Sequence, residues 1–352
     1  MILAGDIGGT KTHLALYDWT AERIDPLRLE TFHSADYGSL EELLADFLSP
    51  PKPPLAVDQV EHAEDEGSSS IVSQNEPPTL HAACFGVAGP VFQNHSRTTN
   101  LPWIVDGPAL SKQFDIAHVQ LFNDLEAMAH GILLLRPDEL VTLNPGTPPS
   151  HKQAIALIAA GTGLGESILV WDGTCYRPMP SEGGHTDFAP NSDQEIDLLR
   201  YIRSQYLHVS YERVLSGPGL QAIYEYLREA KKNEPTWLAE KIKAGDPAAE
   251  IAEAGLKGQA EIAKQALDLF ASIYGAEAGN LALKAMAING VYIGGGIAPK
   301  LLAKLKDGTF MKAFINKGRY KRLMSQIPVH VVMNQHTALL GAAAMAARLA
   351  QS

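Results

Sequence analysis

The chain has 352 residues, a length that favours two domains and suffices for a large hydrophobic core. Apolar residues make up 45% of it and charged residues 20%, a composition that excludes a chain disordered throughout. Its 29 Lys and Arg face 40 Asp and Glu, and the net charge of −11 argues against nucleic-acid binding. An anionic ligand must therefore be held by local features rather than by a basic surface.

Cysteine content and apolar runs narrow the class of protein further. Cys84 and Cys175 are too few for a disulfide framework or a four-cysteine zinc site, and we expect both to be reduced and buried. No apolar run is long enough to span a membrane, and Asp6 interrupts the N-terminus before a signal-peptide core could form. We therefore expect a soluble, cytoplasmic protein.

The N-terminal part predicts strands joined by short turns. Apolar runs at 2–4 and 13–17 flank a polar glycine turn, which predicts a buried hairpin. The Pro-rich, acidic segment 50–78 has little apolar periodicity, and we interpret it as a surface insertion without chemistry. The apolar run 82–88 then predicts another buried strand.

A polar strand end follows. Residues 119–122 predict a strand that stops at Asn123 and Asp124, and 125–135 have helical spacing. In open α/β sheets, ligands gather at the carboxyl ends of the strands. We therefore expect Asn123 and Asp124 to face a ligand.

The second half repeats the hairpin pattern. Runs at 154–160 and 167–171 flank another glycine turn. The helical pattern at 246–287 is too long for one element and predicts a bend or break near Gly275 or Gly279. The other predicted elements are helices at 193–206, 216–230 and 337–349, and a strand at 291–293 that runs into three glycines.

The common nucleotide and hydrolase signatures are absent. The sequence contains no GxxxxGK[ST], and the glycines at 161–165 have the wrong spacing for a Rossmann fingerprint. It also lacks HExxH and GxSxG. These absences argue against a P-loop NTPase, a Rossmann dehydrogenase, a zinc metalloprotease and an α/β-hydrolase.

Three glycine turns are candidate phosphate sites, since backbone amides without a neighbouring Cβ can approach an anion closely. Asp6 can hold Mg²⁺ directly or through water, and Lys11 can neutralise phosphate charge. The turns can also be ordinary tight connections, and that alternative stays open. The predicted nucleotide-binding residues are Asp6, Gly8, Gly9, Thr10, Lys11, Gly161, Thr162, Gly163, Gly294, Gly295 and Gly296.

Polar side chains supply candidate catalytic and sugar-binding groups. Asp124, beside Asn123, is the candidate base that accepts a hydroxyl proton during phosphoryl transfer, although the two residues can equally cap a helix. Glu182 and His185 lie in a glycine-rich segment where they can bond sugar hydroxyls, but a histidine in a loop is commonly structural. Glu212 can be a carboxylate near the N-terminus of a helix, where the helix dipole favours a negative charge.

These motifs together resemble bacterial glucokinases of the hexokinase, Hsp70 and actin superfamily, and the resemblance runs nearly end to end. The motifs that carry it are GDIGGT at 5–10, GVAGP at 86–90, TNLPW at 99–103, FND at 122–124, GTGLG at 161–165, EGGHTDFAP at 182–190, ERVLSGPG at 212–219 and GGG at 294–296. The resemblance implies ATP-dependent phosphorylation of glucose at its 6-hydroxyl, the first step of glycolysis, with Mg²⁺ and ATP.

The resemblance also assigns roles to residues. Asp124 would take the proton of the 6-hydroxyl, the two hairpin turns would bind the phosphates, and 294–296 would form the wall of the adenosine site. The residues implied to bind the sugar are Asn100, Asn123, Glu182, His185 and Glu212.

The implied fold is α/β, with two ribonuclease-H-like (actin-like ATPase) domains flanking a central cleft. The small domain would take 1–134 and 336–352, with the insertion 50–78, and the large domain would take 135–335. The resemblance further implies a homodimer.

Three alternatives stay open on the sequence alone. Lys11 makes the first turn similar to that of the ROK sugar kinases, which would imply a broader hexose specificity, although two cysteines cannot form that group's zinc motif. A sugar- and nucleotide-binding regulator on the same fold would need no catalytic base. An actin-like ATPase would hydrolyse ATP without sugar.

Overall fold

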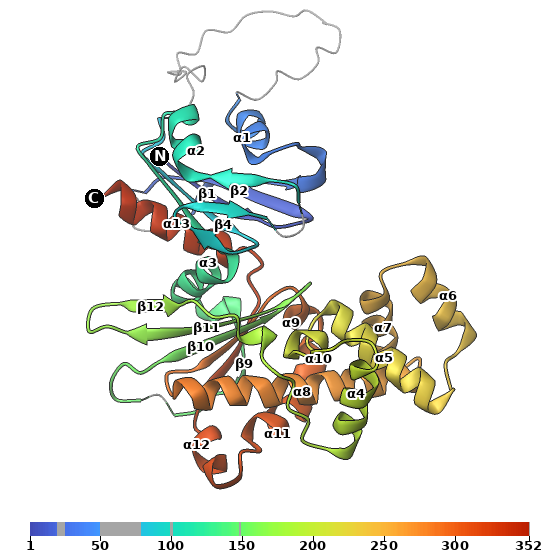
Figure 1. Cartoon of the computed structure of the whole chain (residues 1–352). Helices are drawn as coiled ribbons and strands as arrows, with labels where there is room; N and C mark the ends of the chain where they lie inside the picture. The colour runs from blue at the N-terminus through green and yellow to red at the C-terminus, as the bar shows by residue number, and fades with distance from the viewer. Residues whose placement is uncertain (20–24, 50–78, 99–100, 148, 352) are drawn as a thin grey trace, which may run out of the picture. The chain divides into compact units, whose positions relative to one another are not determined.

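The computed structural model describes residues 1–19, 25–49, 79–98, 101–147 and 149–351 (Figure 1). By its internal contacts the chain divides into unit 1, Met1–Ala127 with Ala342–Ser352, and unit 2, Met128–Gly341. The predicted domain limits remain a prediction. Asn100 and the segment 50–78 lie outside the described residues.

Unit 1 is built on a five-stranded sheet. Strand β1 pairs antiparallel with β2 and parallel with β4, and β4 runs parallel with β8. Strands β1 and β4 are almost entirely buried, as their apolar runs predict. The sheet has the order β3-β2-β1-β4-β8, with β1 Ile2–Ile7, β2 Lys11–Tyr17, β3 Pro26–His33, β4 Ala82–Val87 and β8 His118–Asn123.

Amphipathic helices complete unit 1. Ser39 caps α1, Leu40–Leu48, whose Leu43 and Phe47 enter the core. Asp106 caps α2, Gly107–Phe114. The remaining elements are the 3₁₀ turn η1 at Ser34–Asp36, α3 at Asp124–Gly131, which runs on into unit 2, and a small sheet of β5 Val91–Phe92, β6 His95–Arg97 and β7 Ile104–Asp106.

Unit 2 contains a six-stranded sheet. Strand β10 pairs antiparallel with β11 and parallel with β13, and β13 runs parallel with β14. The order is β12-β11-β10-β13-β14-β9, with β9 Leu140–Asn144, β10 Ile155–Ala160, β11 Leu164–Trp171, β12 Tyr176–Met179, β13 Val291–Gly294 and β14 Val329–Val332.

The two sheets repeat one topology. In each, a three-stranded antiparallel meander continues into two parallel strands, β3-β2-β1-β4-β8 in unit 1 and β12-β11-β10-β13-β14 in unit 2. The predicted hairpins are therefore the same element of a duplicated fold.

Helices cover the sheet of unit 2. The central helix α8 packs against α5, α7, α11 and β10, and it forms the long orange helix of Figure 1. The helices of the unit are α4 Asp193–Arg203, α5 Gly217–Lys231, α6 Thr236–Ala244, α7 Pro247–Leu256, α8 Glu261–Ala285, α9 Ile297–Lys300, α10 Leu302–Leu305, α11 Thr309–Ile315 and α12 Lys321–Met324. The last helix, α13 at Thr337–Ala350, begins in unit 2 and ends in unit 1.

The break in the long helical pattern lies elsewhere than predicted. It follows α7 at Gly258, whose φ of +63° suits glycine, while α8 continues through Gly275 and Gly279. Those two glycines serve packing instead. A Cβ added at Gly275 would lie 2.1 Å from the carbonyl oxygen of Phe310, so its absence lets α11 approach α8.

Candidate active site

The carboxyl ends of three parallel strands meet at one edge of the unit 1 sheet. The register aligns Ile7 of β1 with Val87 of β4 and Asn123 of β8. Asp6 comes one residue before that edge, and Asp124 directly after it as the first residue of α3. The sheet thus brings together Asp6, Asn123 and Asp124, and the last two end a strand as the sequence predicts.

Backbone contacts fix the Asn123 and Asp124 side chains. The Asn123 amide donates to the carbonyl of Gly89 at 3.1 Å, and its oxygen accepts from Leu125 N at 3.0 Å. Leu125 N also donates to Asp124 Oδ1 at 2.9 Å. Asn123 therefore joins the end of β8 to the 86–90 motif, a role that its prediction as a sugar ligand did not include.

Asp6 and Asp124 form an acidic pair. Burial raises the pKa of the Asp6 carboxyl to about 7, and the negative charge of Asp124 adds to the shift. Among the described residues there is no group of three or more His, Cys, Asp or Glu placed to hold a metal ion. Mg²⁺ commonly takes one or two carboxylates and completes its shell with water and phosphate oxygens, so this acidic pair fits that ion.

Hydrogen bonds of buried hydroxyl groups hold the first glycine turn in place. Gly8 N donates to the Lys11 carbonyl at 3.0 Å, which closes the turn. Ser34 Oγ donates to the Gly8 carbonyl at 2.8 Å and lies 3.0 Å from Thr12 Oγ1, while Ser34 N donates to the Thr10 carbonyl at 3.0 Å. Sequence reasoning missed Ser34, because it lies 24 residues beyond Thr10 and no motif marks it.

The second glycine turn, in unit 2, is held by backbone and by a carboxylate. Gly161 N donates to the Gly163 carbonyl at 2.8 Å, and Gly217 N donates to the Gly161 carbonyl at 2.9 Å. Leu164 N donates to Glu212 Oε2 at 3.0 Å. Glu212 lies in the 3₁₀ turn η5, Tyr211–Arg213, rather than at the start of an α-helix.

The segments that carry the predicted sugar ligands of unit 2 are paired with each other. Glu182 precedes the 3₁₀ turn η4, Gly183–His185, and Tyr211 N donates to the Thr186 carbonyl at 3.0 Å. A Cβ at Gly184 would lie 2.0 Å from the Leu164 carbonyl oxygen, so this glycine lets the segment press on β11. The side chains of Glu182 and His185 are exposed. Unit 2 therefore groups three predicted sugar ligands, Glu182, His185 and Glu212, around β11.

The third glycine turn follows β13. Gly295 has a φ of +81°, and a Cβ there would lie 2.3 Å from the Ala160 carbonyl oxygen, so the turn packs against the second one. Tyr274 OH accepts from Ala160 N at 3.2 Å beneath the turns. The helix that follows this turn, α9, has only four residues and is too short to supply an N-terminal anion site.

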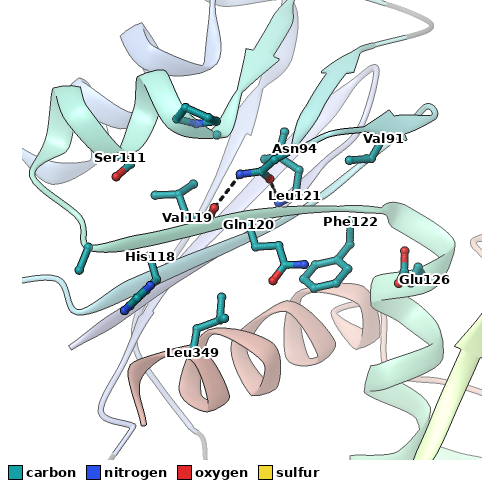
Figure 2. Close-up of a pocket in the computed structure, with 13 residues that line it drawn as sticks. Val91, Asn94, Ser111, His118, Val119, Gln120, Leu121, Phe122, Glu126 and Leu349 are labelled. Carbon is teal, nitrogen blue, oxygen red and sulfur yellow. Dashed lines mark hydrogen bonds between the residues drawn. The ribbon is translucent and has the colours of Figure 1, made fainter. Parts of the chain in front are cut away.

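One pocket of unit 1 lies apart from these residues. It has a volume of about 610 Å³ and is lined along β8 by Val119, Gln120 and Phe122, with Leu349 of α13 beside them (Figure 2). Asn94 fixes this edge by donating to the Val119 carbonyl and accepting from Leu121 N, both at 2.8 Å. No predicted site residue lines it.

The two cysteines differ in how far they are buried. Cys84 is buried, as expected, but Cys175 is only partly buried, and both are free thiols. Within the described ranges, no helix is both long and apolar enough to cross a membrane.

The duplicated sheets, with a glycine hairpin in each, are those of an α/β protein of the actin-like ATPase fold. The sequence profile of the glucokinase family matches residues 3–349. A glucokinase from Synechocystis sp. is 41% identical, with 98% of each chain covered, and one from Nostoc sp. is 39% identical, with 99% of each covered. The crystal structure of a glucokinase from an Antarctic psychrotroph superposes with a TM-score of 0.78 at 29% identity, covering 100% of this chain and 99% of that one.

The chain therefore belongs to the glucokinase family. The comparisons confirm the predicted family, the fold class and the prediction that the chain is a kinase of the glucokinase type. The individual site residues stay predictions.

Proposed function

We propose that this chain transfers the γ-phosphoryl group of ATP to the 6-hydroxyl of glucose and releases glucose 6-phosphate and ADP. The observation that carries the proposal is the placement of Asp6 and Asp124 at the carboxyl edge of the unit 1 sheet, beside the first glycine turn. Membership of the glucokinase family supports glucose as the acceptor and ATP as the donor.

Asp124 is the proposed catalytic base. As the hydroxyl oxygen forms its bond to phosphorus and the bond to ADP breaks, the hydroxyl proton passes to the Asp124 carboxylate. The hydrogen bond from Leu125 N fixes the direction of the Asp124 carboxyl group. Asn123 would form a further hydrogen bond with the sugar, as donor or as acceptor.

The glycine turns are the proposed phosphate sites, and the third turn the proposed adenosine wall. Amides of Gly8, Gly9 and Thr10 in unit 1 and of Gly161, Thr162 and Gly163 in unit 2 would bind phosphate oxygens. Asp6 would hold Mg²⁺, directly or through water, and that ion when bound neutralises the charge that develops on the phosphates. Lys11, exposed at the start of β2, would add a positive charge. Gly294, Gly295 and Gly296 would line the adenosine.

The proposed sugar ligands of unit 2 are Glu182, His185 and Glu212. Asn100 is a further proposed sugar ligand. Their hydrogen bonds to the hydroxyls would distinguish a hexose from water as the acceptor. Glu182→Gln or His185→Ala should mainly weaken sugar binding, by about 1 to 3 kcal/mol for a hydroxyl of the bound sugar left without its partner. A glucose KM equal to that of the parent would remove the altered residue from the sugar site.

A coupled assay of ADP release with and without glucose tests the proposal. Glucose-dependent release is the expected result, release without sugar would indicate an actin-like ATPase, and no release would indicate a binding regulator. A panel of mannose, fructose and glucosamine then tests for the broader specificity of a ROK-like hexokinase.

We further propose a homodimer, as the family resemblance implies. We also propose a cytoplasmic location, because ATP, the proposed donor, is made inside cells. Light scattering of the purified protein tests the oligomeric state.

A further inference from the structure

A buried acidic pair lies beneath the sugar-binding segments of unit 2. Glu166 on β11 is 2% exposed and Glu277 on α8 is 0% exposed, although carboxylates are rarely buried without partners. A side-chain hydrogen bond joins the two. Since an ionised carboxylate has no hydrogen to donate, one of the two must carry a proton.

The contacts of the pair identify which residue is protonated. Glu277 Oε2 accepts from Asn280 Nδ2 at 2.7 Å, and Lys284 Nζ lies 3.3 Å from Glu277 Oε1, so Glu277 has its own donor and a positive charge beside it. Burial, and then the charge of Glu277, raise the pKa of the Glu166 carboxyl to about 8. At neutral pH Glu166 is therefore the donor.

Glu166 supports the segment that carries two proposed sugar ligands. A Cβ at Gly183 would lie 2.1 Å from Glu166 Oε2, so the backbone between Glu182 and His185 rests directly on this carboxyl. Glu166 Oε1 is buried without a hydrogen-bond partner among the described residues. A buried acceptor without a hydrogen-bond partner is unfavourable, so packing alone does not account for a glutamate at this position.

Glu277 extends the support to the second sugar segment. Asn280, which donates to Glu277, also lies 3.1 Å from Tyr211 OH, and Tyr211 directly precedes Glu212. Lys317 Nζ fixes the other end of the Asn280 amide by donating to Oδ1 at 2.6 Å. One buried pair thus contacts both segments that carry proposed sugar ligands.

We propose that Glu166 is a positioning residue of the hexose site, whose protonated carboxyl, bonded to Glu277, holds the 182–185 segment where Glu182 and His185 can bind the sugar. The proposal rests on the proposed function, which assigns those residues to the sugar. When Glu166 ionises at alkaline pH, the hydrogen bond is lost and two negative charges face each other, so the support under Gly183 weakens. The other titratable groups facing the pair are Lys284 and Tyr274 of α8, Tyr211 of η5, and Lys317, with Glu195 of α4 acting on Lys317.

The test measures KM for glucose and for ATP across the alkaline range in matched variants. For the parent, we expect the glucose KM to rise about tenfold between roughly pH 7 and pH 9, while the ATP KM changes by less than about twofold. Glu166→Gln keeps the shape and a donor but cannot ionise, so its glucose KM should match the parent at pH 7 and stay level to pH 9. Glu166→Leu has no donor and should raise the glucose KM about tenfold already at pH 7. Glu253→Gln makes the same substitution at an exposed position in unit 2 and should keep the parent's profile.

A Glu166→Gln profile that rises like the parent's, or a parent glucose KM level to pH 9, would overturn the proposal. If Glu166→Leu fails to fold, the Glu166→Gln profile alone decides. Thermal unfolding gives a second readout. A carboxyl whose pKa is raised on folding costs stability as pH rises toward that pKa, so the parent should lose stability on this side and Glu166→Gln should lose less. Absence of glucose-dependent ADP release from the parent at pH 7 would instead contradict the proposed function, which separates the two failures.

Discussion

The two glycine hairpins occupy the same place in a repeated sheet, yet the units place their carboxylates differently. Asp6 lies opposite Gly86 in the parallel register of unit 1, and the corresponding residue of unit 2, opposite Gly294, is Ala159. Unit 1 therefore has an acid before its turn, at the strand edge. In unit 2 the acid follows the turn, as Glu166, and points into the protein.

The carboxylates of the two units therefore differ in purpose: those of unit 1 are placed for chemistry, and those of unit 2 support the backbone. The carboxylates of unit 1 stand where substrates gather in open α/β sheets, whereas Glu212 and Glu166 of unit 2 hold a turn and a glycine-rich segment in place. On the proposed function, a common backbone turn would bind phosphate in both units, while only unit 1 would add a base and a metal ligand to it.

Removing the proposed base should give the largest effect. Asp124→Ala is expected to lower kcat by roughly 10²- to 10⁴-fold, about 3 to 5 kcal/mol, while glucose binding is largely retained. Steady-state kinetics and calorimetric titration with glucose measure the two quantities. Asp115→Asn is a matched control, because Asp115 is exposed in the same unit and its left-handed backbone tolerates Asn. Parent-like turnover of Asp124→Ala would show that Asp124 is not the base.

Replacing Asp6 of the first hairpin by the alanine found at the corresponding position of the second hairpin should have the next largest effect. Asp6→Ala reproduces Ala159 and should lower kcat by about 10- to 100-fold at limiting Mg²⁺, with part of the loss recovered at high Mg²⁺. A Mg²⁺ titration of the rate measures this, and an unchanged Mg²⁺ dependence would contradict the metal role. The pKa of Asp6 is raised to about 7 on folding, so its ionised form costs stability above that pH. The variant should therefore unfold at no lower temperature than the parent at pH 8.

Much of the fold followed from sequence because its signals are local. Apolar runs beside adjacent glycines predicted both hairpins, and the strand ending at Asn123 placed Asp124 correctly at the carboxyl edge of the sheet. The helix break was misplaced because a glycine signals both a turn and close packing. Only the backbone angle at Gly258 and the contact of Gly275 with α11 distinguish the two.

The supporting residues could not be predicted, because their partners are distant in sequence. Ser34 meets Gly8 across 26 residues, and Asn280 meets Tyr211 across 69. A buried Glu166 also contradicts the usual exposure of glutamate, so nothing in its own sequence neighbourhood marks it. Motifs identified the residues proposed to touch substrates, and tertiary contacts were needed to find what holds them.

Glu212 tests whether a carboxylate of unit 2 binds sugar as well as supporting the turn. Glu212→Gln keeps an acceptor for Leu164 N but loses the charge, so we expect the glucose KM to rise about tenfold and the ATP KM to change by less than about threefold. Kinetics with each substrate varied in turn measure the two constants. Equal rises in both would assign Glu212 to the turn alone.

Ser34 offers the smallest and most selective change. Ser34→Ala removes the hydrogen bond to the Gly8 carbonyl and the contact with Thr12, at about 1 kcal/mol for a typical hydrogen bond. Because only the first turn loosens, the ATP KM should rise about threefold to fivefold, while the glucose KM and the sugar-binding enthalpy stay at the parent values. Ser49→Ala, which removes an exposed hydroxyl bonded to the Ala45 carbonyl at the end of α1, is the control and should change neither constant. If Ser34→Ala weakened glucose as much as ATP, the hydroxyl would stabilise unit 1 as a whole, and the assignment of separate supports to the two hairpins would be wrong.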